Sequence, residues 1–432
     1  MHQDARQHVP HNVVVNIADG AFFGLGMGMA SYVTIIPLFL ATLTESPILI
    51  GLITAMHEIG WYLPQLFTAR RVAGLRRYKP MTVRMTLHER LPFFAMAILA
   101  LFAPQIGKEV ALVLMFMLVA WQAIGGGLTA TAWQSMIGKI MPDRVRGTFY
   151  GIQSSAANLL MSGGAVAAGF ILAAVPNPYN FTIAFMLCGI AMMVSWVFIS
   201  MTRELDSEPT VAVADRGDMR QFGRKLRQIL AEDVNFRWFI VARLLAMFAG
   251  LGLYFFSLYA VRRFGVDEVE VGVMTGILML FTVFANPILG ALGDRTSHRL
   301  MYAFSVLLAG ISGAVAMLAP DAGWMYVAFA LMGAAKAGLW TIPLPLTTQF
   351  GRESDRPYYI GLTNTLIAPG AIAAPIIGGA LAEGANFGAA FIVSAIAGVI
   401  GAAVLIFIVR EPRSIAYPIQ GAETAFAVTG GD

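Results

Sequence analysis

Eight ionisable side chains stand inside stretches of sequence that are otherwise apolar, and they are the residues best placed to do chemistry. They are Asp19, His57, Glu58, His88, Glu89, Arg90, Arg243 and Lys336. A charge in an apolar environment is costly unless it pairs with an opposite charge, exchanges a proton or binds a charged ligand. The acids and histidines could therefore carry a proton, and the two isolated cations could bind an anion.

Glu58 and Arg90 fall at similar depth in neighbouring apolar stretches that a short loop joins. At about 1.5 Å per helical residue, each lies roughly 15–18 Å from the loop-facing ends of those stretches. We therefore expect Glu58 and Arg90 to form a structural charge pair. The alternative is that Glu58 carries a transferable proton.

The elements that must position these charges are membrane-spanning helices. Of the 432 residues, 58% are hydrophobic and 12% are charged, whereas a soluble domain has about 25% charged residues. Twelve stretches approach the roughly 20 residues that cross a bilayer. They cover residues 13–40, 48–69, 80–103, 109–134, 147–175, 181–202, 236–261, 269–292, 300–319, 323–348, 358–383 and 387–409. The sequence predicts an all-α membrane protein.

Basic residues in the connections predict the orientation. One set of loops contains Arg70, Arg71, Arg76, Arg77, Lys79, Lys139, Arg144, Arg146, Arg216, Arg220, Arg224, Lys225, Arg227, Arg295, Arg299, Arg352, Arg356, Arg410 and Arg413. The opposite set contains Lys108, Arg262 and Arg263. By the positive-inside rule, the first set of loops is predicted to be cytoplasmic. Both termini are then on the cytoplasmic side of the cell (inner) membrane. The polar segment 1–12 lacks the apolar core of a cleaved signal.

Sequence repeats divide the chain into two related halves. Ile50–Ala55 recurs as Val271–Gly276, and Arg146–Ile152 recurs as Arg356–Leu362. We predict two pseudo-symmetric six-helix bundles, residues 1–202 and 236–432 with a short C-terminal tail, joined by a cytoplasmic linker at 203–235. Within the linker, 219–230 fits either an amphipathic surface helix or a solvated basic segment.

A loop motif gives the most specific resemblance. Gly290-Ala-Leu-Gly-Asp294-Arg295-Thr-Ser-His-Arg299 resembles the G-x-x-x-D-R-x-G-R-R signature of the major facilitator superfamily, with Ser297 in place of glycine. The resemblance covers nearly the whole chain and is to a poorly described bacterial-type branch. It implies that Asp294 caps a neighbouring helix and pairs with arginines as a cytoplasmic latch. The matching loop at 68–79 has no acidic residue.

A second motif of that superfamily departs from its usual place. Gly370-Ala-Ile-Ala-Ala-Pro375-Ile-Ile-Gly378-Gly379 resembles the antiporter pattern, but it lies in the eleventh stretch and not in the fifth. We expect either a hinge at Pro375, Gly378 and Gly379 or a packing notch. The displacement weakens the case for drug efflux.

In the resembled fold, a central cavity between the halves would bring together several of the candidate residues. Asp19 and Arg243 would face each other across it, and Lys336 and Trp340 would share one helix face. The full set of substrate-binding candidates is Asp19, Trp121, Gln122, Asn158, Arg243, Tyr254, Lys336, Trp340 and Asn364. Asp19 and Glu58 are the candidates for proton coupling. Because one acid would oppose two cations, we expect an anionic substrate.

The function predicted is secondary active transport of a small organic solute by alternating access, coupled to protons by symport or antiport. The alternatives are a multidrug efflux transporter, a membrane-embedded enzyme and a non-transporting sensor. We expect no catalytic residues, no cofactor and no metal, since the lone Cys188 excludes a multi-cysteine site and no phosphate-binding glycine loop is present. The expected partners are the substrate, a proton and the bilayer, not nucleic acid, with the chain acting as a monomer.

Overall fold

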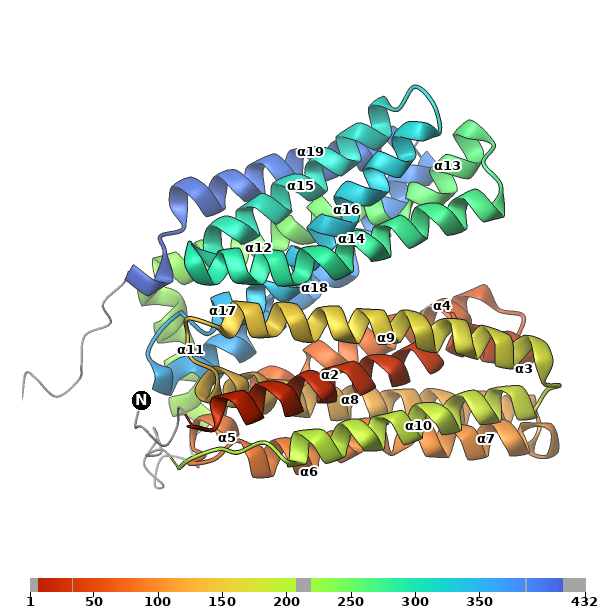
Figure 1. Cartoon of the computed structure of the whole chain (residues 1–432), viewed down its shortest axis with the longest axis horizontal. Helices are drawn as coiled ribbons and strands as arrows, with labels where there is room; N and C mark the ends of the chain where they lie inside the picture. Colours follow the sequence, from red (N-terminus) through yellow and green to blue (C-terminus); the bar gives the residue numbers. More distant parts are fainter. Residues whose placement is uncertain (1–6, 33, 207–218, 385–386, 415–432) are drawn as a thin grey trace, which may run out of the picture.

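The computed structural model describes residues 7–32, 34–206, 219–384 and 387–414, and every regular secondary-structure element among these residues is a helix. The helices form two bundles that lie side by side along the long axis (Figure 1). We call α2–α10 the first bundle and α12–α19 the second bundle. The predicted all-α membrane fold of twelve helices in two six-helix bundles is confirmed.

Nine helical pieces of the first bundle fall within the residues that the structure describes. They are α2 (Val9–Met29), α3 (Ile35–Leu43), α4 (Pro47–Tyr62), α5 (Pro64–Ala73), α6 (Lys79–Arg90), α7 (Pro92–Ile106), α8 (Lys108–Ile140), α9 (Arg146–Ala174) and α10 (Tyr179–Ser200). The linker contains α11 (Met219–Glu232).

The second bundle repeats this arrangement. Its pieces are α12 (Val234–Ala249), η2 (Gly250–Tyr254), α13 (Phe256–Phe264), α14 (Glu268–Arg295), α15 (His298–Leu318), α16 (Gly323–Thr341), α17 (Pro343–Thr347), α18 (Arg356–Gly384), α19 (Phe387–Ala403) and η4 (Val404–Ile408). Among the described residues, eleven segments are long and apolar enough to span a bilayer. The second predicted span corresponds to α4 followed by α5.

Several predicted spans are broken where continuous helices were expected. Pro64 and Pro92 each begin a new helix, in the second and third spans. Proline has no N–H to donate and its ring clashes with the preceding turn, so it is favoured at the first helical position. The first span is also interrupted, because α2 ends at Met29 and α3 begins at Ile35.

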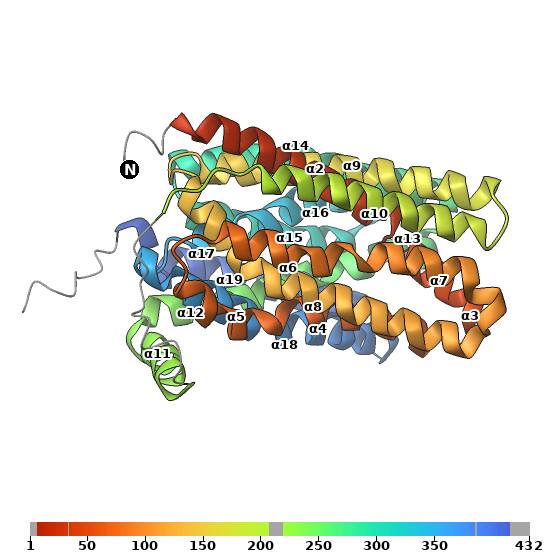
Figure 2. The ribbon, with the colours of Figure 1, turned by 90° about the horizontal axis from the view of Figure 1, so that it is seen from below.

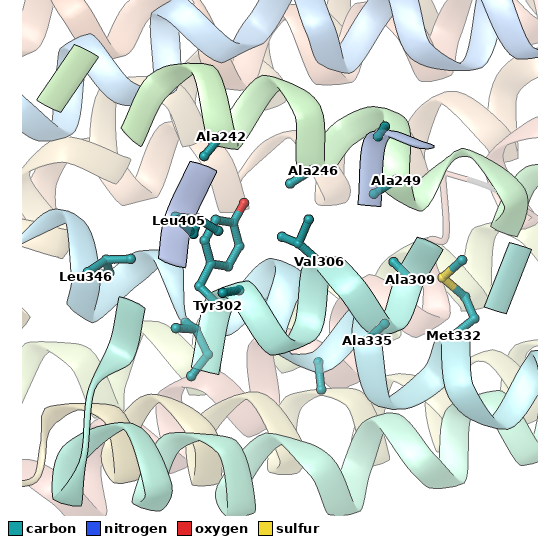
Figure 3. Close-up of a cluster of buried hydrophobic side chains, with 14 of the residues drawn as sticks. Ala242, Ala246, Ala249, Tyr302, Val306, Ala309, Met332, Ala335, Leu346 and Leu405 are labelled. Atoms are coloured by element: carbon teal, nitrogen blue, oxygen red, sulfur yellow. The ribbon is translucent and has the colours of Figure 1, made fainter. Parts of the chain in front are cut away.

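The core of the second bundle forms between α12, α15 and α16. Figure 3 shows Tyr302 of α15 near Leu405 and Val306, with its oxygen directed toward α12. Alanines at 242, 246 and 249 present a smooth face of α12 to that core. Small residues allow helix backbones to approach closely, which is the main source of packing energy within lipid.

The two bundles contact each other at one end, which we call the basic end because the arginine-rich loops lie there (Figure 1). α14 packs on α9 and α18 packs on α5. A Cβ added to Gly290 would lie 2.2 Å from the backbone oxygen of Gly147, so the two backbones touch. Ser155 of α9 donates a hydrogen bond to the carbonyl of Val283 of α14.

Beyond Ser155 the two bundles diverge toward the opposite end of the molecule. One turn further along α9, Leu159 is 60% exposed, and one turn further along α14, Leu280 is 53% exposed. Ribbons of the two bundles separate over the same stretch in Figure 1. The molecule is therefore closed between the bundles at the basic end and open at the other end.

The linker helix α11 docks on the second bundle at the basic end (Figure 2). Its apolar residues Phe222 and Ile229 are buried in the core of that bundle. Lys225 forms an ion pair of 3.1 Å with Asp355, which precedes α18. The apolar face of the predicted amphipathic helix is thus turned toward the protein, and its arginines Arg224 and Arg227 are exposed.

Candidate functional site

Glu58 lies between the bundles with its side chain exposed, although it belongs to a membrane-spanning segment. The face of α4 that carries it is turned toward the second bundle. Trp61, one turn further, has its ring centroid 6.0 Å from that of Trp340 in α16. Glu58 also lies close enough to Tyr254 to interact electrostatically. Among the described residues, no hydrogen bond or ion pair engages the Glu58 carboxylate.

Polar contacts between the bundles close the space on the basic-end side of Glu58. Asn364 Nδ2 donates to Gln65 Oε1 at 2.5 Å, joining α18 to α5. Thr341 Oγ1 lies 3.0 Å from Ser154 Oγ and donates to Asn286 Oδ1 at 2.6 Å, joining α16 to α9 and α14. These side chains form the floor of the site, and hydrogen bonds in a dry interior hold such a contact firmly.

Two cations of the second bundle border the same region. Arg243 is 7% exposed, and its guanidinium donates to the Tyr302 hydroxyl at 3.3 Å. The Arg243 Nε has no hydrogen-bond partner among the described residues. Tyr62, next to Trp61 on α4, is close enough to interact electrostatically with both Arg243 and Glu58.

Lys336 lies one helical turn before Trp340 on the same face of α16. Because Trp340 contacts Trp61 of the first bundle, this face is turned toward the space between the bundles. No acidic side chain or hydrogen-bond acceptor engages the Lys336 ammonium among the residues that the structure describes. The ammonium is therefore available to a ligand.

The predicted charge pair between Glu58 and Arg90 is wrong. Arg90 forms an ion pair with Asp19 at 3.2 Å and a second with Glu89 at 3.6 Å. Its guanidinium also donates to Ser195 Oγ at 2.8 Å and to the Met192 carbonyl at 3.0 Å. Equal depth placed Glu58 and Arg90 together in the prediction, but their helices turn these side chains to opposite sides.

The predicted contact between Asp19 and Arg243 is also wrong. Asp19 is 5% exposed and accepts hydrogen bonds from Ser195 at 2.5 Å and from Arg90, both in its own bundle. It faces α6 and α10 and not the second bundle. Asp19, Glu89 and Arg90 therefore form a buried charge network inside the first bundle.

Trp121 and Gln122 also lie within the first bundle. Gln122 Oε1 accepts from the Tyr32 hydroxyl at 2.7 Å and is 3.1 Å from His57 Nδ1. Trp121 points elsewhere, because its Nε1 donates to His88 of α6 at 3.2 Å. Both were predicted to bind substrate, and the contacts described here join them to residues of their own bundle.

The remaining candidates lie near the space between the bundles. Tyr254 in η2 is 59% exposed, as is Trp340. The Asn158 amide donates to the Ser154 carbonyl on its own helix at 2.8 Å, one turn before it. Since Ser154 contacts the second bundle, Asn158 lies at the point where the bundles part.

The loop motif brings Asp294 to the start of a helix in the other bundle. Its carboxylate accepts hydrogen bonds from the backbone N–H groups of Gly147 and Thr148, at 2.8 and 2.6 Å, and from the Thr148 hydroxyl at 2.7 Å. These groups begin α9, and a carboxylate is favourable at a helix N-terminus. His298 lies 3.3 Å and Arg413 lies 3.9 Å from the same carboxylate.

The two arginines of the motif behave differently. Arg299 donates to the carbonyls of Leu405, Ile406 and Val409 at the end of the last span, so it caps a helix C-terminus. Arg295 is exposed. Neither of them pairs with Asp294, and the arginine near Asp294 is Arg413.

The second motif lies within the continuous helix α18. A Cβ added to Gly378 would lie 2.7 Å from the Phe255 ring, whereas one added to Gly379 would meet nothing within 4 Å. Gly378 is therefore a point of close packing against the seventh span. A hinge at Pro375 stays a prediction.

Sequence reasoning missed most of the floor, although the repeats contain a signal for it. Gln65 and Asn286 occupy equivalent positions after the paired segments that begin at Ile50 and Val271. Ser154 and Asn364 are likewise equivalent after Arg146 and Arg356. Aligning the two halves position by position would have selected these four polar residues.

Two helical bundles that touch at the basic end and part toward the other end, with charged and aromatic side chains on the surfaces that face each other, form the architecture of this chain. The family model of the Major Facilitator Superfamily matches residues 249–429. Together with the fold of the whole chain, this match over the second half supports the predicted major facilitator superfamily transporter. The narrower bacterial-type branch stays a prediction.

Solved structures share this fold over nearly their full length. The E. coli fucose:proton symporter has a TM-score of 0.75 at 14% identity, covering 95% of this chain and 100% of the symporter. The proton:xylose symporter XylE has a TM-score of 0.69 at 15% identity, covering 94% and 97%. A human organic anion transporter has a TM-score of 0.68 at 12% identity, covering 92% and 99%.

Curated relatives are matched over about a quarter of their own length. A probable vesicular acetylcholine transporter of Danio rerio is 27% identical over 129 residues, which are 30% of this chain and 26% of the relative. The thioclapurine efflux transporter of Claviceps purpurea is 25% identical over 143 residues, 33% of this chain and 26% of the relative.

Proposed function

We propose that this transporter carries a small organic anion by alternating access and couples its movement to protons. In this proposal the basic end is cytoplasmic, and both termini lie on the cytoplasmic side of the cell membrane. The described conformation is then open to the outside of the cell. Support comes from the loop charges and from a similar structure, the symporter FucP, whose described state is outward (TM-score 0.72, 15% identity).

The observation that carries the proposal is the charge balance of the space between the bundles. Asp19 is neutralised by Arg90 within the first bundle, so Glu58 is the acid that remains at the site. Opposite it stand Arg243 and Lys336, and neither forms an ion pair with an acid of the described chain. A surplus buried cation is expensive without a counter-charge, and a transported anion would supply one.

Glu58 is the better candidate for the proton, and Asp19 the poorer one. The Glu58 carboxylate is exposed toward the space between the bundles, whereas the Asp19 carboxylate already accepts two hydrogen bonds in a closed network. Protonation of Glu58 would remove the negative charge from the site and so favour entry of an anion. We propose that the substrate and the proton move together through this linkage.

Multidrug efflux is a second candidate, because two curated relatives are described as efflux transporters. Two fixed cations without an ion-pair partner would be unfavourable beside the varied apolar compounds that an efflux transporter binds. Purified protein in liposomes tests both functions. Accumulation of an organic anion driven by a proton gradient supports the proposal, and export of neutral or cationic drugs without anion transport contradicts it.

Replacing Lys336 with alanine is expected to weaken binding of the transported anion by about thirty- to a hundredfold, since a charged hydrogen bond in a dry site contributes roughly 2–3 kcal/mol. A thermal-shift screen against a metabolite library first identifies the ligand, since binding to the folded state raises its apparent stability. Calorimetric titration then compares the variants.

Lys108→Ala is the matched control, because Lys108 is exposed at the start of α8 and far from the site. We expect this control to bind like the unaltered protein. A neutral or cationic ligand whose affinity survives Lys336→Ala would overturn the assignment of an anionic substrate.

Glu58→Gln is expected to abolish accumulation driven by a proton gradient while leaving exchange of labelled for unlabelled substrate intact. Glutamine keeps the shape of the side chain but cannot bind and release the proton. Counterflow and gradient-driven uptake are measured on the same liposomes. Glu109→Gln, an exposed change on α8, serves as the control, and a Glu58→Gln protein that still concentrates substrate would exclude Glu58 as the proton carrier.

A further inference from the structure

A second cavity lies at the basic end of the first bundle, away from the space between the bundles. Its volume is about 590 Å³, and the ends of α2, α6 and α10 surround it. Its lining includes five basic residues and one acid: His8, Arg77, Lys79, Arg84, Arg203 and Glu204. Nothing in the transport cycle proposed above uses this cavity.

The single acid in the lining is already neutralised. Glu204 accepts hydrogen bonds from the backbone N–H groups of Tyr78 and Lys79 at 2.9 and 2.7 Å, where α6 begins. It also forms an ion pair of 2.9 Å with Lys139, and its side chain is fully buried. Glu204 therefore contributes little negative charge to the cavity.

Three cations are left without a counter-charge. Arg77 pairs with Asp206, but the side chains of Lys79, Arg84 and Arg203 have no hydrogen-bond or ion-pair partner in the part of the chain that the structure describes. Arg84 and Arg203 are exposed. Their convergence on one cavity leaves a surplus of positive charge there, which a bound anion would offset.

The cavity also has an apolar side. Val83, Met201 and Leu205 belong to its lining, and Met201 and Leu205 are 48% and 39% exposed. Trp196, whose indole N–H donates to the Val83 carbonyl at 3.0 Å, is a residue type typical of the membrane interface. Basic and apolar surfaces thus adjoin where a span leaves the hydrocarbon.

We propose that this cavity binds the phosphate headgroup of an anionic membrane phospholipid, with an acyl chain along the apolar side. Basic pockets at the ends of transmembrane helices suit anionic headgroups, because each Lys or Arg near the surface attracts the negative charge. Because the cavity joins α2, α6 and α10, a bound lipid would stabilise the first bundle. The proposal does not depend on which solute is transported.

The test uses the full chain purified in a neutral detergent. Phosphatidylglycerol or phosphatidylcholine is added in mixed micelles, and the unfolding temperature and the number of lipids retained in native mass spectrometry are measured. We expect phosphatidylglycerol alone to raise the unfolding temperature. Arg84→Gln with Arg203→Gln should weaken its binding by at least about tenfold, because two cations are lost.

Arg224→Gln with Arg227→Gln is the matched control, since it removes the same charge from exposed positions of α11. Arg84→Lys with Arg203→Lys should retain binding. If the cavity variant and the control variant lost phosphatidylglycerol binding equally, the lipid would be attracted by surface charge in general. That result would refute a specific site in the cavity. Inorganic phosphate that reproduces the full stabilisation would assign the cavity to a free anion, and no response to phosphatidylglycerol would also refute the proposal.

Discussion

Replacing Arg90 with methionine is expected to destabilise the first bundle by about 3–5 kcal/mol, the range observed when one partner of a buried ion pair is removed. Methionine preserves the apolar stem but leaves Asp19 and Glu89 without the guanidinium that lies 3.2 and 3.6 Å from them. Both carboxylates are almost completely buried. The unfolding temperature in detergent and the yield of monodisperse protein measure the effect.

A rescue experiment separates loss of charge from loss of packing. Adding Asp19→Asn and Glu89→Gln to Arg90→Met removes the unpaired charges, and we expect most of the lost stability to return. Arg71→Met, at an exposed position of α5, should change the unfolding temperature little. If the triple variant is no more stable than Arg90→Met alone, the network does not depend on charge and its assignment as an ion-pair network fails.

Replacing Gly290 with leucine is expected to open the transporter at the basic end. A Cβ at this position would lie 2.2 Å from the Gly147 backbone oxygen and 2.7 Å from its carbonyl carbon. Backbone atoms cannot move aside as a flexible side chain can, so α14 must separate from α9. The separation also lengthens the hydrogen bonds between Asp294 and the start of α9, which hold the bundles together.

Cysteine labelling measures this change of conformation, because the native Cys188 is fully buried and should not react. We expect a cysteine replacing Ser154, in the floor, to react from the basic end at least about tenfold faster when Gly290→Leu is present, as for a population shift of that size. A cysteine replacing Leu159 should react more slowly from the opposite end. Reagents that cannot cross the bilayer also identify which end is cytoplasmic.

Gly272→Leu provides the control on the same helix, since a Cβ there would meet nothing within 4 Å. It makes the same change in helix propensity without a clash. Labelling rates should then match those of the parent. Unchanged labelling in Gly290→Leu would mean that the contact between Gly147 and Gly290 does not control the closed state.

The structure reverses the roles that the sequence predicted for Asp19 and Glu58. Asp19 was expected to face the second bundle, and Glu58 to pair with Arg90. The structure buries Asp19 against Arg90 and Ser195 and leaves Glu58 exposed. The charge balance between the bundles is unchanged, because one acid still stands against Arg243 and Lys336. The anionic-substrate proposal therefore rests on a different acid.

What the sequence determined by itself follows from length and composition. Twelve apolar stretches predict helices, because backbone polar groups in lipid must be satisfied within helices. The sequence repeats predict that these helices form two related halves of six. The resemblance of the loop motif to the superfamily signature likewise implied that Asp294 caps a helix. The apolar stretches, the repeats and the loop motif are all defined by the order of residues along the chain, so they can be read from the sequence alone.

What only the tertiary structure decided is the direction in which each side chain points. A residue count gives depth at about 1.5 Å per residue, but the rotation of a helix about its own axis depends on packing with all its neighbours. Glu58 and Arg90 share a depth, yet α4 turns Glu58 toward the second bundle while α6 turns Arg90 toward α2 and α10. Pro64 and Pro92 also interrupt the helices of the second and third spans. Partners of buried charges therefore could not be assigned before the helices were packed.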